Sequence, residues 1–205
     1  MAEAALNPTE FERLTRPLKR LKVSLVWHNV IRNRDTAQGM RSLAAVAGLS
    51  LAWPYDAVLE QLEKNPEHVS FSTLSFELGS LEKTRRLSTP SRPLAPANLS
   101  YYGASQKQGQ ASLDFGRWWR VESPRAITFS SETDPKEIEE ELQSFTGRRV
   151  VDVQVTGRLP ELIVCFSRRR WIQSFADYSQ PCWQISLPDS SWIGSKSGRL
   201  VRGGL

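Results

Sequence analysis

The chain has 205 residues, of which 40% are hydrophobic, and its 27 Lys and Arg against 22 Asp and Glu give a formal net charge of +5. This length suits one domain or two small halves with a common core, and the apolar content excludes global disorder. No run of about 18 apolar residues exists, which excludes a membrane-spanning helix, and the small basic excess does not by itself indicate nucleic-acid binding.

The expected compartment follows from the N-terminus and the cysteines. Residues 1–14 lack the basic segment and following apolar segment of a secretory signal. Two cysteines are too few for a disulfide scaffold. We therefore expect a cytoplasmic protein with reduced thiols, although Cys165 and Cys182 flank one predicted hairpin and could approach each other.

Residues 1–50 are predicted to be an N-terminal helical segment. The sequence Asn-Pro-Thr-Glu at 7–10 has the residue order of a capped helix start, and the helix must end or kink near Pro17. Residues 22–31 fit a strand and a helix equally well. A second helix is expected over 35–47, followed by glycine.

Residues 51–130 are predicted to form a first α+β half. Leu74, Phe76 and Leu78 alternate with polar residues, so they should share the buried face of a strand. The expected elements are a helix from Pro54, a strand within 68–80, a proline-rich loop at 84–98, a hairpin at 101–116, and strands at 117–121 and 125–131.

Residues 131–205 are predicted to form a second α+β half. Thr133 or Asp134 should cap its helix, and Gly147 should follow the end of that helix. Trp192 falls in a segment that resembles a loop. The expected strands lie at 149–155, 161–167, 170–176, 182–187 and 199–201.

The two halves resemble each other, which suggests an internal duplication of a unit made of one helix and several antiparallel strands. Each half begins with an acidic helix that opens at a proline. Each also contains a Trp-[Arg/Gln]-[Val/Ile]-x-x-Pro segment, at Trp119 and at Trp183. Similar strand propensities could produce the same likeness by chance. In either case we expect one compact α+β domain built on antiparallel sheet.

The order of these segments resembles that of small uncharacterised bacterial α+β proteins associated with toxin-immunity and defence loci. The resemblance covers residues 54–190 and is carried by WRV at 119–121, GRRV at 147–150, LIVCF at 162–166 and WQI at 183–185. It implies a protein that acts by binding a protein partner in an immunity or antiviral defence system.

Motifs for catalysis and cofactors are absent from the sequence. It contains no phosphate-binding loop, no dinucleotide-binding fingerprint, no zinc-protease motif and no nucleophile elbow. His28, His68, Cys165 and Cys182 lack metal-ligand spacing. Asp152 and Glu161 lie on predicted strands, as in metal-dependent nucleases, but no lysine base follows closely. We therefore expect neither an enzyme nor a metal or small-molecule cofactor.

Tryptophan and arginine alternate around residues 117–120. Trp119 and Trp183 are expected to be structural core residues, so Trp118 must point to the opposite face of its strand, beside Arg117 and Arg120. Exposed aromatic and basic side chains suit single-stranded nucleic acid, and they equally suit a protein interface.

Three consecutive arginines, Arg168, Arg169 and Arg170, precede Trp171 where two predicted strands meet, and the expected turn is Ser167-Arg168-Arg169. A two-residue turn favours glycine or asparagine because it needs positive φ, so a wider turn is expected here. The triplet is either a solvated hairpin tip or a contact for an acidic protein or phosphate. Arg148 and Arg149 would join the same patch if strand pairing brings them to the same end.

These observations predict a non-enzymatic cytosolic binding or adaptor protein that acts through protein–protein contact. The alternative is a nucleic-acid-binding protein that uses the surface rich in arginine and tryptophan.

Overall fold

The computed structural model describes residues 4–31, 71–83, 107–116, 118–176, 183–189, 191–196 and 198–204. Within them the chain forms a seven-stranded and a five-stranded antiparallel sheet, a small two-stranded sheet and two α-helices, which confirms the α+β class. The helices predicted over 35–47 and from Pro54, and the proline-rich loop at 84–98, lie outside these residues.

The seven-stranded sheet combines strands from the beginning, middle and end of the chain. All of its pairings are antiparallel. Its strands are, in order across the sheet, β1 (Ala4–Ala5), β14 (Arg199–Gly204), β13 (Ser191–Lys196), β12 (Trp183–Ser186), β6 (Ala111–Phe115), β3 (Phe71–Leu78) and β2 (Val23–Ile31).

The described candidate binding residues lie on the strands of the five-stranded sheet or directly beside them. Its strands are, in order, β8 (Ile127–Ser130), β7 (Trp119–Glu122), β11 (Arg170–Ser174), β10 (Glu161–Phe166) and β9 (Val150–Thr156). The remaining short strands, β4 (Glu82–Lys83) and β5 (Lys107–Gln108), pair with each other.

Two short helices flank the sheets. Helix α1 (Pro8–Thr15) has the predicted capping box, because the Asn7 side chain accepts from the backbone N–H of Glu10 and the Glu10 carboxylate accepts from that of Asn7. Helix α5 (Pro135–Leu142) is capped by Asp134. Single turns of 3₁₀ helix follow them, η1 (Arg16–Leu18) and η3 (Gln143–Phe145). No helix in the described part of the chain is long and apolar enough to cross a membrane.

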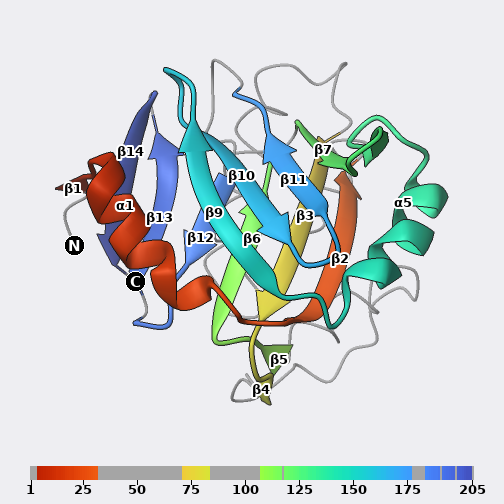
Figure 1. Cartoon of the computed structure of the whole chain (residues 1–205), viewed down its shortest axis with the longest axis horizontal. Coiled ribbons are helices and arrows are strands. Elements are labelled where there is room, and N and C mark those ends of the chain that lie inside the picture. Colours follow the sequence, from red (N-terminus) through yellow and green to blue (C-terminus); the bar gives the residue numbers. More distant parts are fainter. Residues whose placement is uncertain are drawn as a thin grey trace, which may run out of the picture.

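Aromatic side chains fill the space between the two sheets. Leu74, Phe76 and Leu78 are fully buried on one face of β3, as predicted. The ring centroids of Phe76 and of Phe166 on β10 are 5.5 Å apart, so these two residues pack the sheets together. Figure 1 shows the five-stranded sheet in front of the seven-stranded one, with α1 and α5 at opposite sides.

The chain between α1 and β2 connects the two sheets at one edge. The backbone N–H of Val23 donates to the carbonyl of Arg148 at 2.8 Å, and that of Val150 donates to the carbonyl of Leu21 at 2.9 Å. Gly147 ends the preceding helical segment with φ of +81°, which glycine adopts without strain. These bonds fix where Arg148 and Arg149 lie.

Two expectations from the sequence need correction. Residues 23–31, which fitted helix or strand, form β2, so the N-terminal segment is not purely helical. Trp192 lies on β13 and not in a loop. Its indole covers Gly203 so closely that a Cβ there would lie 2.5 Å from the ring. The small residues around Trp192 conceal the strand pattern.

The internal duplication is not confirmed. Residues 51–130 and 131–205 each contribute neighbouring strands to both large sheets, so the two segments do not form separate units. Trp119 lies on β7 of the five-stranded sheet, whereas Trp183 lies on β12 of the seven-stranded sheet. Both side chains are buried in the core, as predicted.

The two buried tryptophans differ in their hydrogen bonding. The indole N–H of Trp183 donates to the carbonyl of Pro160 at 2.7 Å. The indole N–H of Trp119 has no hydrogen-bond partner among the described residues. Buried polar groups without a partner are uncommon in folded proteins, which makes Trp119 the exception to explain.

We expect Trp183→Phe to lower the free energy of unfolding by about 1 kcal/mol more than Trp119→Phe does, because the first change also leaves the Pro160 carbonyl without its donor. Both changes remove the same part of a buried ring, so their difference isolates the hydrogen bond. Urea unfolding of the two variants measures it. Equal costs, or a larger cost at Trp119, would contradict the assignment.

Candidate binding surface

The arginine triplet lies at the turn between β10 and β11. Phe166 pairs with Arg170, so the turn spans three residues, which confirms the wider turn expected from the sequence. Arg168 and Arg169 nevertheless adopt φ of +63° and +55°. The left-handed conformation costs a residue with a Cβ roughly 1–2 kcal/mol. Strained backbone of this kind is concentrated at functional sites in proteins.

Ser167 connects this turn to the beginning of β9. Its backbone N–H donates to the carbonyl of Arg149 at 2.8 Å, and its hydroxyl accepts from the Arg149 N–H at 3.1 Å. The Arg148 guanidinium donates to the carbonyl of Ser167 at 2.9 Å and to that of Ser144 at 2.7 Å. Strand pairing therefore brings Arg148 and Arg149 to the same end of the sheet as the triplet.

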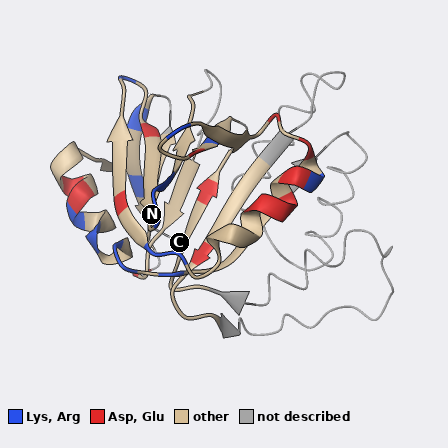
Figure 2. Ribbon diagram, turned by 45° about the vertical axis from the view of Figure 1, so that its right-hand side comes forward, with Lys and Arg blue, Asp and Glu red and all other residues tan. Residues whose placement is uncertain are grey.

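The five arginines at this end form what we call the arginine cluster, which consists of Arg148, Arg149, Arg168, Arg169 and Arg170. Their described hydrogen bonds go to neutral oxygens, including that from Arg170 to the Thr128 hydroxyl at 2.9 Å. Within the described residues none of the five forms an ion pair with a carboxylate. Figure 2 shows blue segments along the lower end of the molecule, whereas red segments follow α5.

Mutual repulsion is visible in the pKa of Arg148. Burial lowers that pKa first, and the positive charges of Arg170 and Arg168 lower it further. An excess of like charge that repels itself and has no acidic partner favours an anionic ligand. Arg168 and Arg169 are exposed at the tip of the turn, where such a ligand can reach them.

The outer face of the five-stranded sheet, which is the side turned away from the core, adjoins the arginine cluster. Trp171 lies on this face next to Arg170 and pairs with Cys165, whose thiol is free. Trp118 is half-buried while Trp119 is in the core, so the two point to opposite sides as predicted.

Arg120 lies on the outer face but is already engaged there. Its guanidinium lies 4.7 Å from the centre of the Phe175 ring, forms an ion pair with Glu122 and donates to Gln173 at 3.3 Å. Arg120 therefore organises the face and does not belong to the arginine cluster. Arg117 lies outside the described residues.

The two carboxylates considered for a nuclease do not converge. Asp152 pairs with Cys165 and Glu161 pairs with Thr156, so they are four residues, or roughly 13 Å, apart along the strands. Lys19 Nζ lies 2.7 Å from Asp152 and is the main reason that the pKa of this carboxyl is lowered. Within the described residues, no three His, Cys, Asp or Glu side chains are grouped to hold a metal ion.

Sequence reasoning missed two carboxylates on the far side of the seven-stranded sheet. Burial raises the pKa of Glu77 to about 7 and that of Asp114 to about 6. Both alternate with core residues of their strands, so the sequence shows that they lie on the sheet face opposite the core. The sequence does not show their burial, because polar residues on alternate positions normally indicate a solvated face. Cys182 and His68 lie outside the described residues.

Comparison with known proteins identifies no relative of this chain. The chain matches no protein-family model, no curated protein and no solved structure at a significant level.

Proposed function

We propose that this is a non-enzymatic cytosolic binding protein that contacts a protein partner through the arginine cluster and the adjoining outer face of the five-stranded sheet. The observation that carries the proposal is the cluster itself. Five arginines from two strand ends are tied together through Ser167, and no described carboxylate neutralises them. An acidic surface on the partner would supply the missing charge.

The composition of the outer face favours a protein partner. Arginine and tryptophan are enriched at the points of an interface that contribute most binding energy. Glu122 and Glu161 lie on the same face, where they bond to Arg120 and to the backbone N–H of Ala176. A mixture of acidic, basic and aromatic groups matches a protein surface better than a uniformly anionic backbone. The resemblance of residues 54–190 to defence-locus proteins suggests a partner from such a system.

The variant Arg168→Ser, Arg169→Ser, Arg170→Ser should weaken partner binding by about 30- to 100-fold, because it removes three of the five charges. Partners captured by the purified wild-type protein would be identified, produced separately and titrated against both proteins by calorimetry. The weakening should decrease as salt rises from about 50 to 200 mM, since screening reduces the contribution of exposed charges.

The matched control is Arg125→Ser, Arg158→Ser, Arg199→Ser. It removes the same charge at three exposed positions outside the arginine cluster. Partner affinity that falls equally in both triple variants would mean that net charge alone matters, and the proposal would be wrong. Undiminished partner binding by the Arg168–Arg170 variant would also show that the proposal is wrong.

One observation favours a second candidate, binding to single-stranded nucleic acid. Trp171 follows the turn directly on the outer face, so an aromatic ring lies beside charges that could contact phosphates. Fluorescent single- and double-stranded oligonucleotides at about 50 and 200 mM salt test this candidate. Micromolar affinity that falls with salt and in the Arg168–Arg170 variant would favour it over the protein partner.

A further inference from the structure

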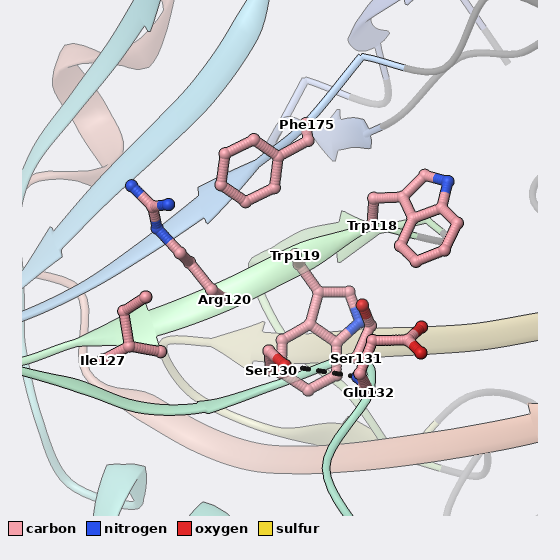
Figure 3. Close-up of a pocket in the computed structure, with 8 residues that line it drawn as sticks. All are labelled: Trp118, Trp119, Arg120, Ile127, Ser130, Ser131, Glu132 and Phe175. Atoms are coloured by element: carbon pink, nitrogen blue, oxygen red, sulfur yellow. Dashed lines mark hydrogen bonds between the residues drawn. The ribbon is translucent and has the colours of Figure 1, made fainter.

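A pocket of about 260 Å³ opens at the edge of the outer face, where β7 begins and β8 ends. Figure 3 shows that its residues come from three segments. They are Trp118, Trp119 and Arg120 of the β7 segment, Ile127 and the turn Ser130–Glu132 of the β8 segment, and Phe175 after β11.

The wall of this pocket contains both an exposed apolar side chain and an unsatisfied donor. Ile127 is 58% exposed, the highest value among the large hydrophobic side chains of the described residues. Trp119 is 1% exposed, and its indole N–H has no partner among those residues. In Figure 3 the indole nitrogen lies on the side of the Ser130–Glu132 turn. A buried donor without an acceptor costs about 1–3 kcal/mol, and an incoming oxygen would recover part of that.

We infer that this pocket receives one aromatic side chain of the protein partner, whose neighbouring peptide carbonyl accepts from the indole N–H of Trp119. The inference rests on the proposed function and assigns the pocket as the anchor point of that interface. The partner's ring would pack against Trp118, Phe175 and Ile127. Because the indole nitrogen is itself buried, the carbonyl reaches it only when the neighbouring Ser130–Glu132 turn shifts.

The size of the pocket favours a side chain over a cofactor. A cavity of roughly 150 Å³ holds a benzene ring, and small-molecule sites usually have about 300–1,000 Å³. The observed volume of about 260 Å³ lies between these values and suits one ring with its peptide group. Interfaces commonly concentrate their binding energy in such a ring inserted into a desolvated pocket.

The backbone at this edge disfavours a partner that extends the sheet. At the end of the edge strand β8, the backbone N–H of Ser130 donates to the Thr133 hydroxyl at 3.0 Å. The carbonyl of Ser130 accepts from the Thr133 N–H at 3.1 Å. An added strand would need these groups. The partner therefore inserts a side chain here and does not add a strand.

The pocket can be probed without the partner by N-acetylphenylalanine amide, which carries one ring and two amide carbonyls. In the ¹⁵N-labelled full chain the indole N–H resonance of Trp119 is assigned by its loss in Trp119→Phe. We expect this resonance to move downfield on titration, with half-saturation on the order of 1–10 mM. N-acetylglycine amide, which lacks the ring, should leave it in place.

Variants distinguish the pocket from the rest of the surface. Ile127→Ser should weaken binding of N-acetylphenylalanine amide at least threefold, whereas Val151→Ser should leave its affinity unchanged. Val151 is 55% exposed on β9 at the opposite edge of the same sheet, so it is a matched apolar control. No movement of the Trp119 resonance, or movement that Ile127→Ser leaves unchanged, would overturn the inference.

The partner supplies a second readout that separates this inference from the proposed function. Ile127→Asp should reduce partner affinity by about 30-fold, the loss typical of a strong interface anchor. Full affinity in Ile127→Asp together with loss in the Arg168–Arg170 variant would refute the anchor and leave the proposed function intact. Equal affinity of the wild type and both variants would refute both.

Discussion

Phe76→Ala is expected to lower the free energy of unfolding by about 3–5 kcal/mol, because it opens a cavity where the two sheets meet. The ring is fully buried and lies 5.5 Å from the rings of Phe145 and Phe166 and 6.1 Å from that of Phe115. These three partners belong to the segment after α5, to the five-stranded sheet and to the seven-stranded sheet. One substitution therefore weakens contacts between all three.

Urea unfolding followed by tryptophan fluorescence and by circular dichroism measures this effect. Ile127→Ala is the control, because its side chain is largely exposed and should cost no more than about 0.5 kcal/mol. The two probes should report one transition in the wild type, since both large sheets share a single core. A loss below about 2 kcal/mol at Phe76, or separate transitions for the two probes, would contradict a common core.

Local patterns in the sequence predicted most of the described elements. The capping residues at 7–10 place the start of α1, and Asp134 with Pro135 places that of α5. Alternation of apolar residues predicted β3 and its buried face. Residues 22–31 stayed ambiguous because the spacing of their apolar residues fits both a strand and a helix, and only pairing with β3 decides for a strand.

The arrangement of the sheets could not be predicted in the same way. The proposed repeat assumed that neighbouring segments fold together, yet β6 pairs with β12 and β7 pairs with β11. Both pairings connect residues that are far apart in the sequence. Such pairings depend on the whole core, and local propensity contains no information about them.

The sequence predicted which arginines belong to the candidate site. It did not predict that strand pairing brings them together. The triplet at 168–170 and the poor fit of arginine to a two-residue turn are visible in the sequence, and the structure has the wider turn. That Arg148 and Arg149 join the triplet depends on the register of β9 with β10. This register contains an irregularity, because Val150 and Asp152 pair with consecutive residues and Val151 is extra.

A strong dependence of stability on pH is expected from the two carboxylates on the other face of the seven-stranded sheet. Glu77 is 8% exposed and accepts from the backbone N–H of Gly109 at 2.6 Å, while Asp114 accepts from the Ser112 hydroxyl at 3.0 Å. Burial raises the pKa of Glu77 from 4.5 to about 7, and the charge of Asp114 adds to this. Burial raises the pKa of Asp114 from 3.8 to about 6.

A raised carboxyl pKa means that the folded state binds protons more readily than the unfolded chain. The associated stability is complete below the unfolded pKa and is lost as pH rises through the folded one. The free energy of unfolding therefore falls between pH 4.5 and about 7 because of Glu77, and between pH 3.8 and about 6 because of Asp114. Both losses remain in full at higher pH. His28 acts in the opposite direction, because burial lowers its pKa from 6.5 to about 4, so its contribution is lost as pH falls through that interval.

The double variant Glu77→Gln, Asp114→Asn should be more stable than the wild type by about 3–6 kcal/mol at pH 8 and equal to it within about 1 kcal/mol at pH 4. The amides keep oxygen acceptors for the Gly109 N–H and the Ser112 hydroxyl, so the variant removes the ionisation while preserving these bonds. His28 is present in both proteins, and its opposing effect cancels in the difference. Urea unfolding at pH 4, 6 and 8 measures that difference directly.

Glu139→Gln, Glu140→Gln on the exposed side of α5 provides the matched control, because it removes two negative charges that are not buried. Its stability should run parallel to that of the wild type across the same pH range. A constant advantage of the Glu77 and Asp114 variant at all three pH values would show that the gain comes from packing or from net charge. An advantage that grows between pH 4 and pH 8 would show that the seven-stranded sheet buries two groups whose ionisation opposes folding.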